Sequence, residues 1–429
     1  MNYMKKEYID ILKLTRASIL GIKADLDGEI SWTEVCTLLK TGNLYSVVYR
    51  TVLQLSEQIQ IPEKILAEWK SYAFMTGFRQ LRMINELKRV LQEAEDRGIQ
   101  LISFKGMTLA ALYPEPYMRS SSDIDLLVSE EQRKDAEQLF IDLGYKKIDE
   151  LSKNHVPTYV IDNDKRYLKI ELHDRLWEDY EGKQADILKE MCLDNSHSLI
   201  RQEACGLTVT TLGHTEHLIY QIFHIAKHFF FEGISLRYLV DIMLFIEAHK
   251  DAIDFEKARK EIAKLHYEKF YDAILKICYE YLGMKVIVPG SNVENTEVNE
   301  QLLNDVLERS KLDDSVKQWE TINFLSQYFM RASVTKSSDF QQRRKQIFPM
   351  PSELNDRYSY AKKCQLLLPV AWVHRVIYMI GYSRHCKRND MKTSESIAKA
   401  QYRLDLMRKL GITETDKDIQ DLFDEKDDE

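Results

Sequence analysis

Glycine and proline, the residues that most often end helices and form turns, are scarce in this sequence. Its 429 residues include only 15 glycines and 8 prolines, below the usual usage of about 7% and 5%. So few turn-forming residues exclude a collagen-like or mucin-like protein and favour long helices. A chain of this length suits roughly two to four domains, with cores large enough to be stable without disulfides or structural metals.

Paired cysteines and long apolar runs are also missing. The six cysteines stand singly and form no C-x-x-C pair, so we expect free thiols and a cytoplasmic protein. No signal-peptide pattern precedes the charged start. The longest apolar run, residues 366–382, is interrupted by Pro369, His374 and Arg375 and falls short of the ~20 residues of a spanning helix. We therefore expect a buried helix there and no membrane anchor.

An excess of positive charge is absent as well. The 60 Lys and Arg residues face 68 Asp and Glu, for a net charge of -8, so no global basic field exists to hold duplex DNA by counterion release. A basic cluster lies at residues 384–392, but it lacks the interleaved aromatic residues on which single-stranded nucleic acid stacks. A nucleic-acid partner is therefore not favoured.

The hydrophobic periodicity divides the chain into four predicted parts. Residues 1–95 form an N-terminal helical segment, and residues 96–212 carry short apolar runs typical of strands. Residues 213–285 return to helical spacing and are predicted to pack on the cleft beside the preceding part. Residues 286–429 form a C-terminal helical region with exposed loops and an acidic tail. The pattern predicts an α+β fold, with a small mixed sheet embedded in a mostly helical chain.

The second part contains five apolar runs with the length of strands. They are residues 101–104, 126–128, 159–161, 168–172 and 207–212. After the second run, Ser129 and Gln132 predict a capping box for a helix that ends at Gly144.

Two acidic residues head the second of these runs. Residues two apart on a strand project from the same face, so Asp123 and Asp125 place their carboxylates side by side. Ile124 and Leu126 then point into the opposite layer. Two like charges this close stay ionised most easily when divalent cations lie between them. The pair therefore predicts a metal site.

A third acid, Glu171, is the only carboxylate in the apolar run at residues 168–172. An acid in such a run is costly unless it is paired or bound to a cation. Two carboxylates on one strand and a third on its neighbour can hold two Mg²⁺ ions about 3.5–4 Å apart, which bridge a nucleoside triphosphate and an attacking oxygen. Asp-x-Asp triplets are also common by chance, and the alternative is a helical interaction protein with a fortuitous triplet.

These residues resemble a known group of enzymes. A turn at Gly106, the paired acids Asp123 and Asp125 and a third acid at Glu171 resemble the DNA polymerase beta-like nucleotidyltransferase superfamily. The resemblance implies that residues 96–212 form a palm-like nucleotidyltransferase domain. The chain is more closely similar to the uncharacterised bacterial nucleotidyltransferase family, through Lys105-Gly106, Tyr113, Arg119, Asp123-Ile124-Asp125, Glu171-Leu172-His173 and Pro369-x-x-Trp372.

The resemblance implies a role for each acid. Asp123 and Asp125 would bind both metal ions, Mg²⁺ or Mn²⁺, and Glu171 would hold the ion that lowers the pKa of the acceptor hydroxyl. The superfamily usually has Gly or Ser after its turn glycine, whereas this chain has Lys105 before Gly106 and Met after it. Lys105 is therefore expected to supply a phosphate-binding charge.

Further polar residues are expected near the acids. Ser122 and Arg119 complete the expected nucleotide-binding set with the lysine and glycine of the turn, but Arg119 fits equally a loop arginine that pairs with Glu115 or is solvated. His173 shares the face of Glu171 if the strand continues. It fits either a hydrogen-bond partner of the acid or a substrate contact.

A polar stripe follows on the next predicted helix. His217, Gln221, His224 and His228 recur at helical spacing. We predict that His224 and His228, together with Lys227, line the cleft beside the sheet; a hydrogen-bonded seam between domains is the alternative. Zinc is not favoured, because no H-E-x-x-H sequence and no third ligand accompany the pair.

The predicted activity is transfer of a nucleoside monophosphate from an NTP to a hydroxyl-bearing acceptor, with release of pyrophosphate. A small-molecule acceptor is favoured. A tRNA end or a protein side chain, as in other branches of the superfamily, is one alternative, and a non-catalytic module that binds a nucleotide or a partner protein is another. On a later helix, Arg237 and Asp241 stand one turn apart and predict an intrahelical ion pair. The alternative is that either side chain reaches the cleft.

Overall fold

The computed structural model divides into two compact units, each treated by itself. Unit 1 comprises Met1–Asp313, Lys409–Ile412 and Asp428–Glu429, and unit 2 comprises Asp314–Arg408 and Thr413–Asp427. The predicted site residues all lie in unit 1. The structure describes residues 4–148, 156–163, 166–176, 183–191, 199–231, 233–292, 294, 297–308, 360–361, 367–374 and 393–412.

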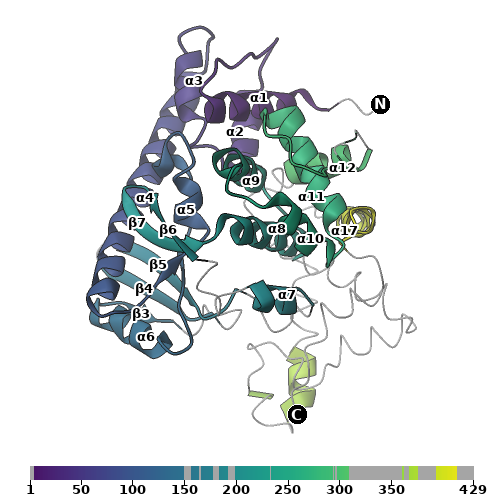
Figure 1. Ribbon diagram of the computed structural model, residues 1–429. Coiled ribbons are helices and arrows are strands. Elements are labelled where there is room, and N and C mark those ends of the chain that lie inside the picture. The colour runs from purple at the N-terminus through teal and green to yellow at the C-terminus, as the bar shows by residue number, and fades with distance from the viewer. Residues whose placement is uncertain are drawn as a thin grey trace. The chain divides into compact units, whose positions relative to one another are not determined.

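Helices open unit 1, and the longest of them supports the sheet (Figure 1). α1 (Lys6–Leu20), α2 (Trp32–Thr41) and α3 (Tyr49–Leu55) precede α4 (Glu63–Asp96), which has 34 residues. The buried positions of α4 recur every three or four residues, as expected for one apolar stripe along a helix. They are Trp69, Ala73, Gly77, Gln80, Met83, Leu87, Val90 and Ala94.

A seven-stranded mixed sheet follows, in the order β3-β4-β5-β2-β1-β7-β6. β2 pairs with β5 and β1 pairs with β7 in parallel, and the other neighbouring strands are antiparallel. The predicted fold class, a mixed sheet within a mostly helical chain, is confirmed. The strands are β1 (Ile102–Ser103), β2 (Ile124–Leu127), β3 (Lys146–Lys147), β4 (Thr158–Asn163), β5 (Arg166–His173), β6 (Leu199–Ala204) and β7 (Leu207–Leu212).

Two of these strands were not predicted from the sequence, although each of the five predicted runs overlaps one. β3 is a pair of exposed lysines, and β6 has a mixed polar sequence. Both lie at the edges of the sheet, where a strand is half solvated and needs no continuous apolar run. Their pairing is set by β4 and β7 rather than by their own pattern.

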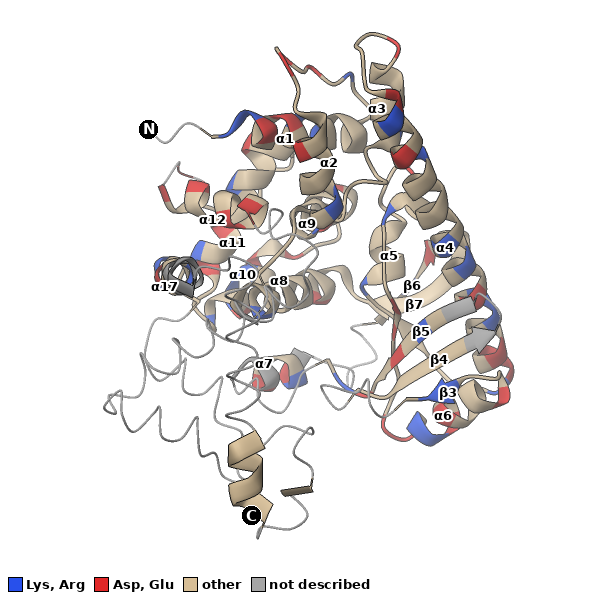
Figure 2. Cartoon of the chain, turned by 180° about the vertical axis from the view of Figure 1, so that it is seen from behind, with Lys and Arg blue, Asp and Glu red and all other residues tan. Residues whose placement is uncertain are grey.

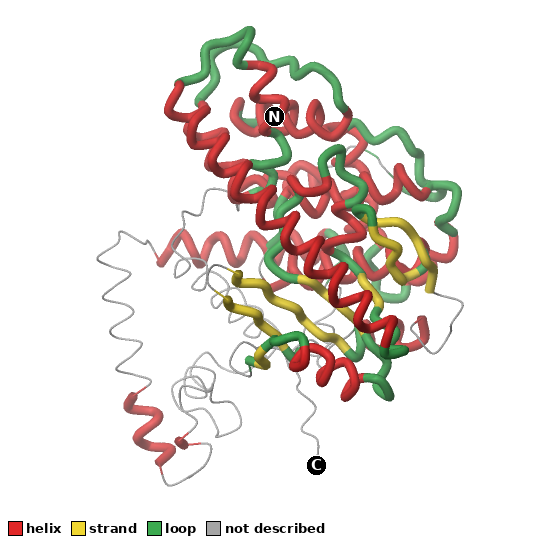
Figure 3. Tube along the Cα trace, turned by 90° about the vertical axis from the view of Figure 1, so that its left-hand side faces the viewer, coloured by secondary structure: helices red, strands yellow, loops and turns green. Residues whose placement is uncertain are grey.

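One face of the sheet is covered by α4 and α6 (Arg133–Asp142), as Figures 1 and 3 show. Leu126 of β2 and Ile170 of β5 are fully buried there, in one core with Leu87 of α4 and Phe140 of α6. Because side chains alternate between the two faces of a strand, residues 123, 125, 169, 171 and 173 must point away from this core. The packing of α4 and α6 therefore directs the acids to the opposite face.

The predicted capping box of α6 is only half formed. Gln132 N–H donates to Ser129 Oγ at 3.4 Å, but the Gln132 side chain does not return to Ser129. It donates to the Gly98 carbonyl at 2.8 Å and accepts from the Gln100 N–H at 2.9 Å. The prediction is wrong for Gln132 because a neighbouring turn provides better partners than the helix end does. The helix stops before Gly144, which has a φ of 89°, as predicted.

Helices make up most of the rest of the described chain. Figure 2 colours α8 and α9 almost entirely tan, in keeping with their mostly buried, uncharged side chains. The helices after α4 are α5 (Gly106–Ala110), η1 (Pro116–Met118), α6, α7 (Lys183–Met191), α8 (His214–Phe231), α9 (Leu236–His249), α10 (Phe255–Ala263), α11 (Glu268–Ile277), the π-helical η5 (Cys278–Leu282), α12 (Glu297–Glu308) and α17 (Thr393–Lys409).

The apolar run at residues 366–382 differs from its prediction in the part that is described. Residues 368–374 are helical, but Val370 and Val373 are more than half exposed while Ala371 is buried. The expectation of a buried helix is therefore wrong for this segment, which buries only one side. Among the described residues, no helix is long and apolar enough to cross a membrane.

Three cysteines can be placed, and all three are free thiols: Cys36, Cys205 and Cys278. The other three cysteines lie outside the described residues, as do the basic cluster at residues 384–392 and the predicted acidic tail. The division into four parts that the sequence suggests stays a prediction.

Candidate active site

A tight turn links β1 to α5 at the edge of the candidate site. Lys105 has a φ of 60° and a ψ of -116°, a backbone conformation that side chains other than glycine rarely adopt. A Cβ on the next residue, Gly106, would lie 3.3 Å from Ser121 Oγ and 3.8 Å from the Asp123 carbonyl oxygen. Glycine therefore lets the loop of Ser120, Ser121 and Ser122, here called the serine loop, approach the turn closely. This brings the end of β1 against the start of β2.

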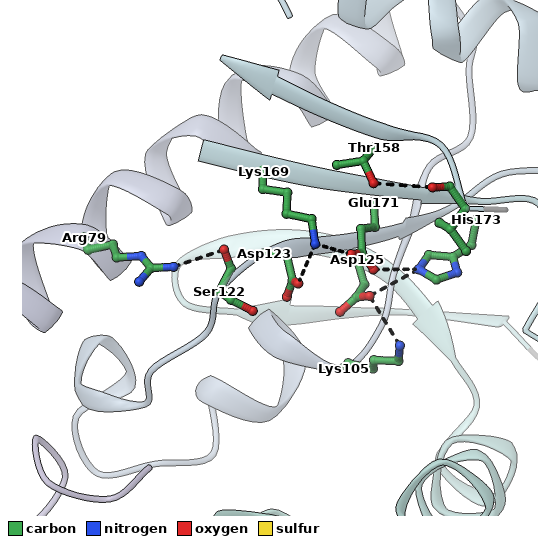
Figure 4. A network of polar contacts seen from close by, with 10 residues as sticks. Arg79, Lys105, Ser122, Asp123, Asp125, Thr158, Lys169, Glu171 and His173 are labelled. Carbon is green, nitrogen blue, oxygen red and sulfur yellow. Dashed lines mark hydrogen bonds and ion pairs between the residues drawn. The ribbon is translucent and has the colours of Figure 1, made fainter. Parts of the chain in front are cut away.

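The three predicted acids lie together on one face of the sheet (Figure 4). Parallel pairing of β2 with β5 sets Asp125 directly opposite Glu171. Asp123 comes one residue before β2, on the same side as Asp125, while Ile124 and Leu126 enter the core. Strands from segments about 45 residues apart thus assemble the carboxylates that the alternation predicted.

Two lysines pair with these acids. Lys105 Nζ lies 3.3 Å from Asp125 Oδ1. Lys169 Nζ donates to Glu171 Oε1 and lies 3.4 Å from Asp123 Oδ2, so that it sits between two carboxylates. Lys169 was not among the site residues predicted from the sequence. The signal was present, because Lys169 stands two residues before Glu171 on the same strand and must share its face.

His173 completes a set of possible metal ligands. Its Nε2 donates toward Asp125 Oδ1 at 3.2 Å and lies 3.8 Å from Glu171 Oε2. One ligand atom from each of Asp125, Glu171 and His173 falls within 4.8 Å of the others, the one such group found among the described residues. Carboxylate oxygens and an imidazole nitrogen suit a divalent cation such as Mg²⁺ or Mn²⁺.

The neighbours drive the pKa values of the two aspartates in opposite directions. Burial raises the pKa of Asp125, but the Lys105 ammonium and the hydrogen bond from His173 outweigh it, so the net pKa lies well below its ordinary value. Burial and the carboxylates of Asp125 and Glu171 raise the pKa of Asp123. Burial opposes the charge of Lys105, yet Asp125 raises its pKa overall. Asp125 is therefore a fixed anion, whereas Asp123 is the acid most in need of added positive charge.

Arg119 has a partner that the sequence did not indicate. Its side chain is only 3% exposed and forms a two-pronged ion pair with Asp241 of α9, with Nε and Nη2 each 2.8 Å from a carboxylate oxygen. The expected pairing with Glu115 and the solvated alternative are both wrong. The Arg237 contact with Asp241 is present at 3.8 Å, but Arg119 is the closer partner.

Arg119 also holds the turn and the serine loop. Its Nη1 donates to the Gly106 carbonyl at 3.2 Å and to Ser121 Oγ at 2.9 Å. Asp241 in addition accepts a hydrogen bond from Tyr113 Oη at 2.7 Å. These contacts give Arg119 the geometry of a positioning residue for the Gly106 turn.

α4 supports the serine loop from the other side. Arg79 Nη2 donates to the Ser122 carbonyl at 3.1 Å, and Gln80 Nε2 donates to the Ser121 carbonyl at 3.0 Å. The Ser122 hydroxyl hydrogen-bonds Asp123 and lowers the pKa of that carboxyl in part. Sequence reasoning missed the two α4 residues, since a polar residue within a helical pattern gives no hint of a loop about 40 positions away. A small pocket between α4, the turn and β2 is lined by Gln80, Met83, Ser103, Gly106, Asp123 and Asp125.

The predicted stripe on α8 meets the acids through Lys105. Tyr220 hydrogen-bonds Lys105 and packs edge-on against Phe104 at 5.5 Å between ring centroids. His224 stacks on Tyr220 at 5.7 Å, and its Nε2 lies 3.0 Å from His228 Nε2. Burial, followed by the Lys105 charge, holds the pKa of His224 well below its ordinary value.

The remaining members of the stripe diverge. The charge of Lys227 also lowers the pKa of His224, so Lys227 lies near His224. His217, by contrast, is 1% exposed and packs edge-on against Phe245 at 4.9 Å. The stripe therefore runs from a position near the acids into the helical core, and only its C-terminal half approaches the candidate site.

Comparison with known proteins places this chain in a family. The model of the uncharacterised nucleotidyltransferase family matches residues 28–283, well over half of the chain, and the chain belongs to that family. The match spans the sheet, the three acids and the helices α8 and α9. No curated protein matches the sequence.

Three solved structures resemble part of the chain. One is ANT(2'')-Ia in complex with adenylyl-2''-tobramycin, with 17% identity and a TM-score of 0.30, covering 42% of this chain and 95% of that chain. A solution structure of the antibiotic-resistance factor ANT(2'')-Ia has 15% identity and a TM-score of 0.31, covering 47% and 98%. An antigenic nucleotidyltransferase-like protein from Paracoccidioides brasiliensis has 15% identity and a TM-score of 0.29, covering 47% and 93%.

Proposed function

We propose that this member of the nucleotidyltransferase family transfers the nucleoside monophosphate group of an NTP to a hydroxyl of an acceptor, in the presence of Mg²⁺ or Mn²⁺. The observation that carries the proposal is the parallel register that sets Asp125 opposite Glu171, with Asp123 on the same face. Three carboxylates beside a glycine turn suit the in-line displacement at a phosphorus atom.

The acids form the proposed catalytic centre. Asp125, Glu171 and His173 offer oxygen and nitrogen donors close enough to share one cation, and Asp123 stands beside them. A bound divalent cation would neutralise phosphate charge and lower the pKa of the acceptor hydroxyl. The acceptor oxygen forms a bond to the α-phosphorus, the bond to the bridging oxygen breaks, and pyrophosphate leaves with the electron pair. The proposed acceptor of the hydroxyl proton is Glu171.

The turn forms the proposed nucleotide side. Lys105 brings a positive charge beside the acids, and Gly106 leaves room for the backbone to approach a phosphate. Ser122 offers a hydroxyl next to Asp123. Arg119 acts on the nucleotide side indirectly, through its hydrogen bonds to the turn and to Ser121. We propose that His224, Lys227 and His228 line the side of the cleft that faces the acids, next to Tyr220.

The proposed acceptor is a small molecule with hydroxyl groups, and the proposed compartment is the cytoplasm, where NTPs are available. A tRNA end or a protein side chain is the alternative acceptor. Incubation of the full chain with each α-labelled NTP and Mg²⁺ or Mn²⁺, followed by separation of RNA, protein and small-molecule fractions, distinguishes these classes. Labelled nucleotide bound without pyrophosphate release would indicate the non-catalytic binding module instead.

The sharpest test replaces one acid. Asp125→Asn should abolish pyrophosphate release from NTP while the circular dichroism spectrum is unchanged, because the amide keeps the shape of the side chain and removes its charge. The matched control is Glu130→Gln, which removes an exposed acid just beyond the same strand and should keep full activity. Near wild-type transfer by the Asp125→Asn chain would contradict the proposal.

A further inference from the structure

We propose that the ammonium group of Lys169 takes the place of one of the two divalent cations that the sequence led us to expect, so that the site binds a single divalent ion. The inference rests on the proposed function, because it concerns the same acids. It is carried by the position of Lys169 in the sheet, by its contacts and by the charge that the cluster holds.

The sheet fixes where the ammonium lies. β2 and β5 run parallel with Ile124 opposite Ile170 and Asp125 opposite Glu171, so Lys169 stands level with Asp123 on the next strand. Its Nζ donates to Glu171 Oε1 and lies 3.4 Å from Asp123 Oδ2. Figure 4 shows the ammonium between the two carboxylates. This gap is where an ion shared by a paired acid and the third acid would otherwise bind.

The ammonium is partly withdrawn from water. The side chains of Lys169, Asp123 and Glu171 are 22%, 24% and 25% exposed. Charges this shielded are screened less than surface pairs, and a carboxylate left without its partner pays a desolvation cost. Lys169 is therefore held between the acids rather than exchanging freely with solvent.

The charge of the cluster supports one cation rather than two. Three carboxylates with two divalent ions and no lysine would carry one net positive charge. Here Lys105 and Lys169 already offset two of the three negative charges, so a single divalent ion brings the cluster to the same net charge. A second ion would leave an excess of three positive charges within one small site, which Coulomb repulsion opposes.

The ligands that remain form one group. With Lys169 between Asp123 and Glu171, the donors close enough together for a cation within the described ranges are Asp125, Glu171 and His173. This set is distinct from the gap that Lys169 fills, and it contains an imidazole nitrogen. One site for an ion and one fixed ammonium thus stand where two ions were expected.

The experiment counts ions directly. The full chain is titrated with Mn²⁺, alone and with the non-hydrolysable analogue α,β-methylene-ATP, and free Mn²⁺ is measured by electron paramagnetic resonance. The wild-type chain should bind one Mn²⁺ under both conditions. Lys169→Met should raise the count from one to two, because the vacated gap between Asp123 and Glu171 becomes available. Lys169→Arg, which keeps the charge, should stay at one.

A matched control separates position from charge. Lys146 lies two strands away on the same sheet face, since Val160 of β4 pairs with both Lys146 and Lys169, and its side chain is exposed. Lys146→Met removes the same charge and should leave the count at one. Two ions bound by the wild-type chain, or a count that stays at one in a folded Lys169→Met chain, would overturn the inference.

A wrong ion count and a wrong proposed function give different experimental results. Ion binding is read without turnover, so absence of NTP-dependent transfer would end the proposed function and leave the count readable. Conversely, active transfer by a wild-type chain with two bound ions would end only the assignment of Lys169.

Discussion

At the scale of single residues, the site depends on a lysine in an unfavourable backbone conformation. Lys105 has a positive φ, which costs a non-glycine residue of the order of 1–3 kcal/mol. Its ammonium faces Asp125, whose side chain is 10% exposed. The cost in the backbone is thus offset by the neutralisation of a nearly buried carboxylate, and the pair behaves as a unit.

Removal of this lysine should make stability depend on added cations. Lys105→Met leaves Asp125 without its main counter-charge, and breaking a buried pair costs about 3–5 kcal/mol. We expect a clear fall in the free energy of unfolding in EDTA and partial recovery in Mn²⁺, measured by urea denaturation. The double variant Lys105→Met/Asp125→Asn is the control and should be less sensitive to the cation. Equal loss in EDTA and in Mn²⁺ for the single variant would refute the prediction.

At the scale of elements, a buried ion pair joins parts of the chain that are far apart in sequence. Arg119 follows η1 and Asp241 lies on α9, 122 positions later. Both side chains are 3% exposed, so neither charge is compensated by water. The pair connects the helical region to the loop that carries Ser121 and Asp123, and this link orients the site.

Replacement of one partner should be far more costly than replacement of both. Arg119→Met leaves Asp241 buried with Arg237 at 3.8 Å as its remaining cation, and we expect a loss of about 3–5 kcal/mol in the free energy of unfolding. Arg119→Met/Asp241→Leu should recover much of that loss, because no unpaired charge remains. Chemical denaturation of both variants gives the comparison. Similar losses in the single and double variants would show that the unpaired charge of Asp241 does not cause the loss of stability.

The strands that carry the acids were predictable because their signal is local. Alternation over residues 123–126 assigned Asp123 and Asp125 to one face and Ile124 and Leu126 to the other, and the structure agrees. Glu171 stood out as a single acid in an apolar run. The same alternation assigns Lys169 to the acidic face, and only a search for charge partners was needed to find it.

Other parts of the site could not be read from the sequence. The Arg119 pairing depends on a helix that lies 122 positions away, and the support of the serine loop by Arg79 and Gln80 depends on how α4 crosses the sheet. Nothing in a local pattern specifies such contacts. The Gln132 capping box failed for the same reason, since a turn distant in sequence offered its side chain other partners.

At the scale of the whole molecule, burial in the helical region lowers the pKa values of two histidines. Burial, together with the neighbouring His214 and His249, lowers the pKa of His217 to about 3, and burial and His214 lower that of His249 to about 4. Both Nδ1 and Nε2 of His217 are buried and have no hydrogen-bond partner among the described residues. These histidines are therefore neutral in the folded chain at pH 7 and become protonated more readily on unfolding.

Stability should fall as the solution becomes acidic. An unfolded histidine takes up a proton near pH 6.5, while folded His217 does so only near pH 3, so the unfolded state binds more protons between these values. Each such group removes up to about 1.4 kcal/mol per pH unit below pH 6.5. His217→Phe should therefore lose less stability than wild type between pH 7 and pH 5, measured by urea denaturation.

The control for this pH dependence is an exposed histidine. His266 lies on the surface with a φ of 60°, a conformation that asparagine tolerates, so His266→Asn should follow the wild-type curve. The prediction is contradicted if the stability of the His217→Phe chain depends on pH in the same way as that of the wild type and of this control.

The parallel pairing of β2 with β5 has a consequence for how the protein avoids misfolding. A slip of either strand by one residue would turn its charged side chains into the apolar layer beneath α4 and expose its leucines and isoleucines. Such a chain would bury several charges at once, and it would also scatter the carboxylates. A chain with shifted strands would therefore lose both its apolar core and its cluster of carboxylates.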